Sequence, residues 1–585
     1  MRRRTMLAGS AAAIAIPWQS GSSSAGSAFR IRVLPGDPDW PSDADWATLA
    51  SAVGGRLERV AIRVDDADKA RLSNPFYVHD QPQLTQSAGW LDAWTSEPSA
   101  YVVRAASAED VAAAVRFARA RRLCLIVKGG GHSYVGGSNA RGSLLVWTHD
   151  MDGVETHDTF TPHGQAKPAG PAVTLGAGCL WGRVYDAVTT KLGRYVQGGG
   201  CTTVGVAGLI QGGGFGSFSK GFGLAAASLL QAEVVTADGA VRTVNEHRDP
   251  DLFWALKGGG GGTFGVVTKV TLRTHELPES FGAVRWTVRA SSDASFLGLL
   301  DRFLEHCSSN LINPHWGEQV VATPENALIV ELNYQGLTEA EARSAWRDVE
   351  AFVLAHPGDY QSRGLSVTPV PSRRYWDAAY FREHAPNAIR SDDRPGARPA
   401  DFWWSGDGQQ ASAMVYSIVS AWMPAGLLKR AQRPRLAGAW FAASRKWTMA
   451  FHLNKGLAGA SEATLAESRN TSINSQVVDA FALAITGSFG PVGERVLTPN
   501  RVADGRAKAA EVRSAIEELR RVAPNAGAYL SECDYFLENW REAAWGANSR
   551  RLEKIKRRYD PDDLFIVHHG IGSHRWSTDG LSRIA

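Results

Sequence analysis

The sequence predicts a two-lobed α+β protein, and three observations support that prediction. Its 585 residues, 44% of them hydrophobic, are enough for two lobes that each bury a core. Strand and helix patterns alternate between Ser99 and Thr274, and glycine clusters follow several of the strands. A second set of strand patterns, separated by helices, fills residues 277–526. We therefore expect one lobe from each region.

The first lobe opens with a strand–helix–strand pattern. Tyr101–Val103 is a short β-rich run, and the helix predicted over 107–122 has Ser107 as its N-cap. Acidic residues in the first turn and arginines in the last turn complement the helix dipole. The apolar strand predicted over 123–128 runs directly into the glycines at 129–131. This order predicts a β-α-β unit with a glycine loop at its exit.

The rest of the first lobe continues the alternation. Strands are predicted at SLLVW and AVTLGAG, with a polar loop over 155–171 between them. A helix is predicted for WGRVYDAVTTKLG, followed later by a hairpin turn at Asp238-Gly239, because this dipeptide suits tight hairpins. The segment from Asp251 to Thr274 closes the lobe with a helix, a run of glycines and a long strand.

The second lobe is predicted to contain a sheet. The segments with a strand pattern are VRWTV, NALIVELNY, WTMAFHLN and DAFALAIT. Helical segments such as 338–356 separate them.

Composition and charge exclude several classes of protein. The net charge of +4 comes from 63 basic and 59 acidic side chains, whereas a nucleic-acid-binding protein shows a clustered basic excess. No apolar run reaches the roughly 18–20 residues that a membrane span needs. The five cysteines are too few, and odd in number, for a disulfide-built scaffold. No C-x-x-C motif occurs, and His568–His569 has no cysteine nearby in sequence, so we expect no structural zinc and assign no metal ligands.

The first 28 residues have the layout of an export signal. Arg2, Arg3 and Arg4 precede a short apolar stretch and then a Ser/Gly/Ala segment. The arginine pair followed by Thr5-Met6-Leu7 predicts the twin-arginine route, and hence a periplasmic or secreted protein. A basic tail without a targeting role is the alternative, and cleavage near Ala25 or Ala28 stays open.

Residues 197–216 place a single cysteine, Cys201, among many glycines. Taken alone, this thiol could be a small buried hydrophobe, half of a disulfide, or a reactive group beside a cofactor. Glycine clusters at strand ends favour a ligand that carries phosphate, held by backbone N–H groups. The loose G-x-G-x-x-G matches lack the strand–tight turn–helix setting of a dinucleotide fingerprint.

Three glycine-rich stretches together carry a family resemblance. GGGHSYVGGS (129–138), GGGCTTVGVAGLIQGGGFG (198–216) and GGGGGTFGVVTKV (258–270) resemble the PCMH-type FAD-binding domain of berberine-bridge-enzyme-like oxidases, within the vanillyl-alcohol-oxidase superfamily. RLEKIKRRYDPDDLF (551–565) resembles the carboxy-terminal segment of that family. The matches cover residues 96–276 and 527–570, and the region between them matches only loosely.

The resemblance implies a two-lobed division of the chain after the export signal at 1–28. Its parts are an N-terminal extension at 29–95, a PCMH-type FAD-binding domain at 96–276, a substrate domain at 277–526 with an antiparallel sheet covered by helices, and a segment at 527–585 that completes the FAD domain.

The resemblance also implies FAD attached through two side chains. His132 occupies the position linked to the 8-alpha methyl group of the flavin, and Cys201 the position linked to ring carbon 6. An imidazole and a thiolate are suitable nucleophiles for an electron-poor ring. The other residues assigned to the cofactor are Gly129, Gly130, Gly131, Ser133, Gly136, Gly137, Ser138, Gly200, Val204, Gly205, Gly208, Gly213, Gly214, Phe215, Gly216, Gly265 and Val266.

Oxidation of a small-molecule substrate needs a C–H bond directed at flavin N5 and a base for the O–H or N–H proton. Tyr529, Glu331 and Tyr334 are the candidates for this base, followed by His452 and Glu532; packing is the alternative role for each.

Two positions depart from the family pattern. The catalytic glutamate of the berberine-bridge branch aligns with Ala484 or Ile485, and Ser549 stands where a tyrosine is usual. We therefore expect no alkaloid ring closure.

The resulting prediction is a secreted FAD oxidase that acts on a C–OH or C–NH substrate and reduces molecular oxygen to hydrogen peroxide. Val204, three residues after Cys201, occupies a position where the family's oxidases have valine and its dehydrogenases a bulkier residue. Packing beneath the glycine turn is the alternative role for Val204. A dehydrogenase with another electron acceptor, or a flavin-fold binding protein without turnover, stays open, as does the substrate: a carbohydrate, an aromatic alcohol or a natural-product intermediate.

Overall fold

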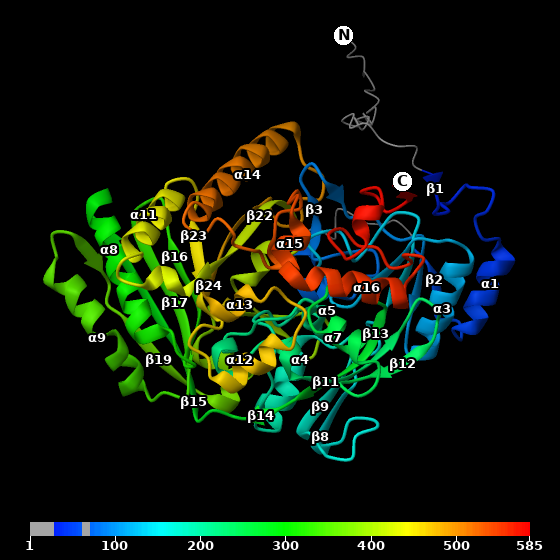
Figure 1. Ribbon diagram of the computed structural model, residues 1–585, viewed down its shortest axis with the longest axis horizontal. Coiled ribbons are helices and arrows are strands. Elements are labelled where there is room, and N and C mark those ends of the chain that lie inside the picture. The colour runs from blue at the N-terminus through cyan, green and yellow to red at the C-terminus, as the bar shows by residue number, and fades with distance from the viewer. Residues whose placement is uncertain (1–28, 61–70, 585) are drawn as a thin grey trace, which may run out of the picture.

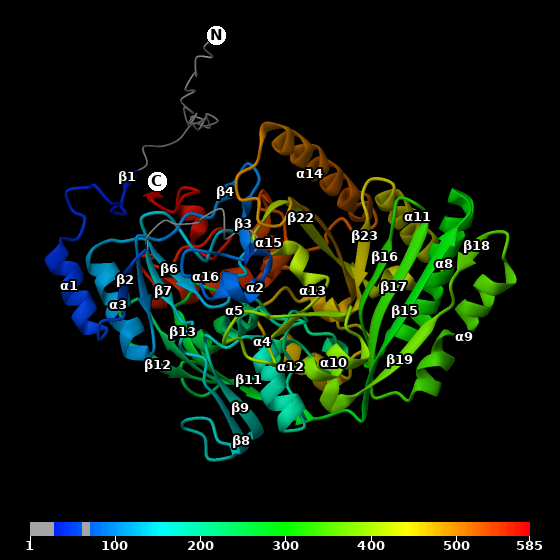
Figure 2. The same ribbon diagram turned by 180° about the vertical axis from the view of Figure 1, so that it is seen from behind.

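The computed structural model describes residues 29–60 and 71–584. The export signal predicted over 1–28 lies outside the described residues. Figures 1 and 2 show two lobes side by side, with a large sheet and its outer helices at one end and β1 (Phe29–Arg30) and the carboxy terminus at the other. The predicted two-lobed α+β class is confirmed.

A four-stranded sheet contains the predicted strand–helix–strand unit. Its order is β2 (Leu57–Arg59), β5 (Tyr101–Arg104), β7 (Leu144–Trp147), β6 (Leu125–Lys128). Strands β5 and β6 both run parallel to β7, so the loops that follow β6 and β7 leave the same edge of the sheet. The helix α3 (Ala108–Ala120) lies between β5 and β6 in sequence, and its N-cap Ser107 forms a capping box with Asp110.

The second sheet of this lobe is antiparallel. Its order is β12 (Val241–Val244), β11 (Leu229–Val235), β13 (Val266–Arg273), β9 (Gly170–Gly176), β8 (Val154–Phe160). The turn predicted at Asp238-Gly239 joins β11 to β12, and Gly239 has a φ of 74°, in the region that favours glycine.

Short helices connect the strands of the first lobe. They are α4 (Trp181–Tyr185), α5 (Val206–Gln211), α6 (Ser219–Phe222) and α7 (Pro250–Leu256). The single helix predicted over 181–193 is wrong in detail, because α4 ends at Tyr185 and Asp186–Lys191 forms a wider, π-helical turn. Val188, Thr189 and Thr190 are β-branched within this turn, and such residues lower α-helix propensity.

A ten-stranded sheet organises the second lobe. Its order is β18 (Tyr360–Ser362), β15 (Ser280–Ala290), β17 (Ala327–Gln335), β16 (Trp316–Ala322), β23 (Met449–His452), β24 (Ala480–Phe489), β22 (Ala413–Pro424), β3 (Ser87–Trp90), β4 (Trp94–Thr95), and β19 (Ser366–Pro371) also pairs with β15. Apart from β22 and β3, neighbouring strands are antiparallel. The predicted antiparallel sheet is therefore confirmed.

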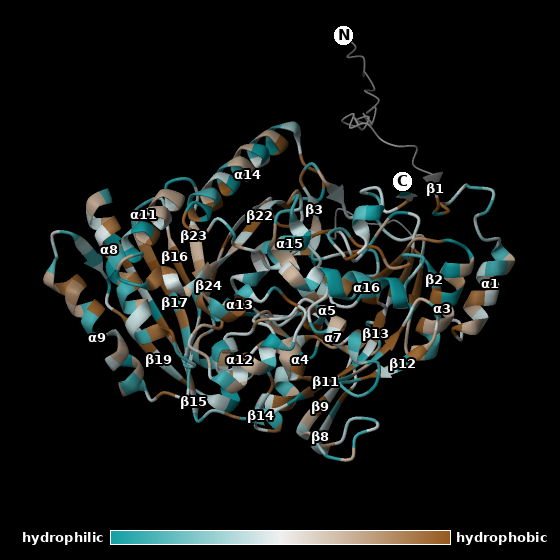
Figure 3. Ribbon diagram, in the orientation of Figure 1, coloured by the Kyte–Doolittle hydropathy of each residue, from teal (hydrophilic) through white to brown (hydrophobic). Residues whose placement is uncertain are grey.

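Helices cover one face of this sheet. They are α8 (Asp293–His306), α9 (Glu339–Ala355), α11 (Arg433–Ser444) and α14 (Pro499–Arg520). Figure 3 shows these helices banded in teal and brown, as expected for helices with one buried side. Along β17, Val330, Leu332 and Tyr334 belong to the core beneath these helices. Because strand residues alternate, Glu331 and Asn333 point to the opposite face, which we call the inner face.

The two ends of the chain are joined to the lobes by pairing and packing. Strand β3, from the N-terminal extension, adds to the sheet of the second lobe, whereas β1 pairs with β25 (Ser582–Arg583). In α16 (Ser549–Tyr559), the buried Lys556 donates to the Thr263 carbonyl at 2.7 Å, which links the C-terminal segment to the first lobe. The predicted domain boundaries stay predictions.

The remaining helices and strands are α1 (Asp43–Ala52), α2 (Pro75–His79), α10 (Ala378–His384), α12 (Glu462–Arg469), α13 (Gln476–Asp479), α15 (Trp540–Trp545), β10 (Arg194–Tyr195), β14 (His275–Glu276), β20 (Ile389–Ser391) and β21 (Phe402–Trp404). Within 29–60 and 71–584, we find no helix with the length and apolarity to span a bilayer.

Candidate active site

The loops that carry His132 and Cys201 meet in the first lobe. A Cβ on Gly130 would lie 2.6 Å from the backbone nitrogen of Gly205, so only glycine allows the two loops to approach this closely. The Thr203 hydroxyl lies 3.2 Å from His132 Nε2. Burial lowers the pKa of His132 to about 4, so its imidazole is neutral and carries a free lone pair at neutral pH. The structure thus brings together two segments that are far apart in sequence.

Cys201 is half-buried at the tip of its loop. The loop is held by β21, which is distant in sequence, because Trp404 Nε1 donates to the Gly200 carbonyl at 3.2 Å. Burial and the neighbouring Asp407 carboxyl raise the pKa of the Cys201 thiol well above its usual value. The Asp407 carboxyl is therefore close enough to the sulfur atom assigned to the cofactor to perturb its ionisation.

The predicted cofactor-binding glycines divide into two groups. Gly208 has an open side, with nothing within 4 Å of a Cβ placed there, and Gly200 has only a Glu318 carboxylate oxygen at 3.9 Å. At the others, a Cβ would lie within 3.3 Å of protein atoms: Gly129, Gly130, Gly131, Gly136, Gly137, Gly205, Gly213, Gly214, Gly216 and Gly265. In this second group the missing side chain permits close approach of protein segments, and the assignment of these glycines to the cofactor stays a prediction.

The non-glycine residues assigned to the cofactor lie in different surroundings. Ser133 accepts a hydrogen bond from the Gly137 nitrogen at 3.0 Å, and Ser138 is buried. Val204 is partly buried beside the core of the first lobe. Phe215 and Val266 are buried in protein cores, so the structure does not support their assignment to the cofactor.

The residues present fit an FAD bound against these loops. The two attachment side chains stand on loops that touch, and neither is sealed inside a core. Gly261, across from Gly208, also has an open side, since a Cβ there would meet only Gly208 Cα at 3.9 Å. Exposed glycine backbone of this kind provides N–H groups for phosphate oxygens. His132 and Cys201 would hold the isoalloxazine, and the open glycines would lie along the rest of the cofactor.

Carboxylates gather around the Cys201 loop. Asp407 has its pKa raised to about 6, chiefly by burial and further by the charge of Glu318. Asp407 Oδ2 is buried and has no hydrogen-bond partner in the part of the chain that the structure describes. Glu318 accepts a hydrogen bond from Ser217 and adopts a φ of 71°, an uncommon conformation for a glutamate. Glu532, a secondary candidate from the sequence, forms an ion pair with Lys455.

Asp407 and Glu318 were missed by the sequence analysis. Asp407 lies in the segment SGDGQQ after the tryptophans of β21, and Glu318 lies within an ordinary strand pattern. A lone carboxylate in a turn or strand carries no distinguishing pattern, so only the glycines flanking Asp407 offered a signal.

A polar row crosses the inner face of the second lobe's sheet. The register places Glu331 opposite both Arg285 and Gln319, and Gln319 opposite His452. Gln319 Nε2 donates to Glu331 Oε2 at 2.7 Å. Burial lowers the pKa of His452 well below its usual value, and its Nδ1 atom has no hydrogen-bond partner among the described residues. Glu331 and His452 were named from the sequence, and the structure adds Gln319 and Arg285.

The two tyrosines proposed as bases lie in contrasting places. Tyr529 is buried next to Phe215, and a Cβ on Gly212 would lie 3.4 Å from its hydroxyl, so it borders the glycine loops. Burial raises its pKa. Tyr334 points to the opposite face of β17 and packs against Trp316 beneath the helices, so it does not lie with the other candidates, and its role as a base stays a prediction. Successive side chains of a strand point to opposite faces, so Glu331 and Tyr334, an odd number of positions apart in β17, lie on opposite faces of the sheet.

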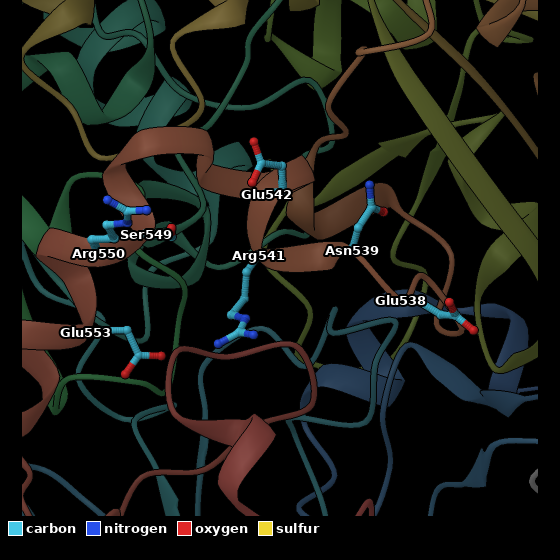
Figure 4. Close-up of a pocket in the computed structure, with 7 residues that line it drawn as sticks. All are labelled: Glu538, Asn539, Arg541, Glu542, Ser549, Arg550 and Glu553. Carbon is cyan, nitrogen blue, oxygen red and sulfur yellow. The ribbon is translucent and has the colours of Figure 1, made fainter.

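A pocket of about 340 Å³ opens elsewhere, on the surface of α15 and α16 (Figure 4). It includes Ser549, which stands where the family pattern has tyrosine. Its charged lining residues are of both signs: Glu538, Arg541, Glu542, Arg550 and Glu553. None of the predicted site residues lines it, and we assign it no function.

Comparison with known proteins identifies two family models in the chain. The model described as an FAD binding domain matches residues 98–245, and the model described as berberine and berberine like matches residues 528–572. Over nearly the whole chain, the sequence is 30% identical to the FAD-linked oxidoreductase malF of Malbranchea aurantiaca, covering 93% of this chain and 92% of that protein.

Solved structures share the fold. A VAO-type flavoprotein from Myceliophthora thermophila superposes with a TM-score of 0.76 at 24% identity, covering 94% of this chain and 99% of the other. The glucooligosaccharide oxidase of Acremonium strictum, described with a 6-S-cysteinyl, 8α-N1-histidyl FAD, superposes with a TM-score of 0.63 at 20% identity, covering 91% and 99%.

Proposed function

The chain belongs to the berberine-like FAD-linked oxidoreductases of the VAO type, and we propose that it is an exported oxidase for a C–OH or C–NH substrate. The proposed reaction removes two electrons from the substrate and reduces molecular oxygen to hydrogen peroxide. The observation that supports it most directly is the buried, unpartnered Oδ2 of Asp407 near Cys201, on the loop assigned to the cofactor.

We propose that FAD is bound through both His132 and Cys201. Support comes from the meeting of their loops, from the neutral imidazole of His132, and from the doubly linked FAD described for glucooligosaccharide oxidase. When bound, FAD supplies the two-electron acceptor for a hydride from the substrate. The chain's part is to orient the substrate and to remove the proton of its hydroxyl or amine.

Asp407 is the proposed base for that proton. A catalytic base is most effective when its pKa lies near the working pH, and burial raises the pKa of Asp407 to about 6. Its unpartnered Oδ2 is available to accept a proton. Tyr529, bordering the glycine loops, and Glu331, on the inner face, stay as the competing candidates from the sequence.

The polar row of Arg285, Glu331, Gln319 and His452 is the proposed substrate-binding surface. It offers a cation, a carboxylate, an amide and a neutral imidazole on one face of the sheet. Such a set can donate to and accept from several hydroxyl or amine groups at once. Substrates with more than one polar group, such as carbohydrates, belong in the first panel to be tested.

The test is a panel of alcohols, sugars and amines mixed with the purified protein under nitrogen. Flavin bleaching identifies a substrate, and the same substrate in air is then expected to yield steady hydrogen peroxide. Bleaching without peroxide would replace the oxidase by a dehydrogenase with another acceptor. No bleaching by any substrate class would favour a binding protein without turnover.

Export by the twin-arginine route is part of the proposal and has its own test. Replacing Arg3 and Arg4 together by lysine should retain the protein in the cytoplasm, because that route reads the arginine pair. Unchanged export of this variant would reject the route.

A further inference from the structure

A cluster of two histidines and an aspartate lies at the edge of the four-stranded sheet, outside the proposed active site. His79 ends α2, Asp80 follows it, and His149 lies two residues after β7. One ligand atom from each of the three lies within 4.8 Å of the others. His149 Nε2 is 3.0 Å from Asp80 Oδ1, and the rings of His79 and His149 are 4.7 Å apart between centroids.

His79 is the unexplained member of this cluster. Its side chain is only 1% exposed, yet neither ring nitrogen has a hydrogen-bond partner within the described ranges. A buried polar group without a partner is costly, and most are satisfied in folded proteins. Burial lowers the pKa of His79 well below its usual value, and the charges of Lys128 and Arg183 lower it further.

The other two members are already oriented by neighbours. His149 Nδ1 is 2.7 Å from Asp150 Oδ1, so its Nε2 atom is directed towards Asp80. Arg394 donates to Asp80 Oδ2 at 2.8 Å, which leaves Oδ1 directed towards His149. Metal-binding histidines usually donate their second ring N–H to a carboxylate or carbonyl in this way.

The surrounding charges are nearly balanced. The cations near the cluster, which oppose a metal ion, are Arg394, Lys128, Arg183 and Arg104. The carboxylates of Asp80, Asp150, Asp392 and Asp401 favour one, and Asp150 and Asp401 accept hydrogen bonds from Arg104 and Arg183. Arg394 also donates a hydrogen bond to Asp392 Oδ2 at 2.6 Å. The Lys128 ammonium donates hydrogen bonds to the Gln81 and Leu84 carbonyls.

We propose that His79, His149 and Asp80 bind one divalent transition-metal ion, with Zn²⁺ the best match to two imidazoles and a carboxylate. An ion at about 2.0–2.2 Å from each ligand atom would replace the His149–Asp80 hydrogen bond with little movement. It would also provide the missing partner of His79. The sequence carries no recognisable metal-binding motif for this site, because His149 is separated by 69 positions from Asp80.

The site has a structural role in this proposal. The segment that follows it, Gln81 to Gln86, supports the loop that carries His132. Lys128 Nζ donates to the Gln81 carbonyl at 2.8 Å, and the Gln86 nitrogen donates to the Gly131 carbonyl at 3.0 Å. A bound ion would fix α2 against the end of β7 and thereby stiffen the base of that loop. Loss of the ion should therefore lower the melting temperature of the protein, and any effect on a catalysed reaction should be smaller.

The experiment uses the full chain without a histidine tag, stripped with a chelator and reloaded with Zn²⁺. Elemental analysis should find about one equivalent that survives gel filtration, and Zn²⁺ should raise the melting temperature of the stripped protein. His79→Leu and His149→Gln should each lose the ion and the thermal shift. His306→Leu is the matched control, since His306 is also a buried histidine with an unpartnered ring nitrogen.

Two results would overturn the proposal. One is stripped wild-type protein that neither takes up Zn²⁺ nor Co²⁺ nor gains stability from them. The other is His149→Gln protein that keeps a full equivalent with an unchanged shift. If His79→Leu does not fold, the Co²⁺ absorption spectrum of the wild type decides, because nitrogen and oxygen ligands in tetrahedral geometry give intense visible bands that octahedral, water-bound Co²⁺ does not.

Discussion

The glycine loops of the first lobe and the inner face of the second lobe's sheet are built in opposite ways. In the loops, the absence of side chains lets Gly130 and Gly205 approach closely and leaves the space beside Gly208 open, so the main chain itself forms this region. On the sheet, four side chains from four different strands form the polar row. A site made of backbone leaves a contiguous glycine pattern in the sequence, whereas a site made of cross-strand neighbours leaves none.

The carboxyl of Asp407 lies where the two regions meet. It comes from neither the glycine loops nor the sheet but from the turn after β21, and it raises the pKa of the nearby Cys201 thiol. In the proposal, His132 and Cys201 of the glycine loops attach the cofactor, and Asp407 from the turn after β21 removes the proton. The predictions below test that division.

The most severe test removes the attachment side chains. The double variant His132→Ala/Cys201→Ala should release all of its FAD when it is denatured in acid, while each single variant keeps one link. Wild type should keep its yellow colour in the precipitate. Cys124→Ala, at another half-buried cysteine, is the control and should behave as wild type. Free FAD from denatured wild type would show that the loops hold the cofactor without covalent links.

The next test removes the proposed base. Asp407→Asn should slow anaerobic flavin reduction by about 10²–10⁴-fold while leaving flavin content unchanged. Tyr334→Phe should have no effect, since that side chain lies on the far face of β17. If Glu331→Gln produces the large effect instead, a residue of the inner face removes the proton. If Tyr529→Phe produces it, the base is the tyrosine that borders the glycine loops.

The same carboxyl predicts a pH dependence. The pKa of Asp407 is raised to about 6 by burial, and a base must be deprotonated to accept a proton. Flavin reduction should therefore be full above pH 6 and fall by up to about tenfold per unit below it. Stopped-flow reduction of wild type and Asp407→Asn across pH measures this, and an acid limb that persists in the variant would assign it to another group.

A smaller effect is expected at the oxygen step. Val204→Leu should slow reoxidation of the reduced protein by about tenfold, equivalent to about 1.4 kcal/mol of barrier. The added methylene would fill space beside the flavin edge, and the rate of flavin reduction in the same variant is the internal control. If the variant reoxidises at the wild-type rate, Val204 does not control the reaction with oxygen and only packs against the core of the first lobe.

The smallest effect is one of stability. Glu318→Gly should raise the free energy of unfolding by at most about 1 kcal/mol, because relief of its φ of 71° is partly offset by loss of the hydrogen bond from Ser217. It should also lower turnover, since Glu318 lies beside Gly200. Asn326→Gly, at a φ of 58° in the turn between β16 and β17, should leave turnover unchanged and gain less, because asparagine tolerates this conformation. Chemical denaturation of both variants measures the difference.

Much of the fold was predictable from local pattern. The capping box at Ser107, the hairpin at Asp238-Gly239 and the strands of the second lobe each depend on neighbours in sequence. The helix over 181–193 was only partly right, since a run of β-branched residues permitted the wider turn after Tyr185. The insertion of β3 into the second lobe's sheet joins residues more than 300 positions apart, and no local pattern encodes such a pairing.

The sequence by itself indicated the FAD-binding region of this protein, because the glycine clusters around His132 and Cys201 are contiguous motifs and the close approach of Gly130 to Gly205 requires glycine. The tertiary structure decided the rest. Glu331 and Tyr334 lie on opposite faces of β17, but only packing decides which face is covered by helices; only folding brings Asp407 near Cys201 and His79 near His149. The physical reason is that pairing partners, burial and pKa are properties of a side chain's surroundings in space, which adjacent residues do not specify.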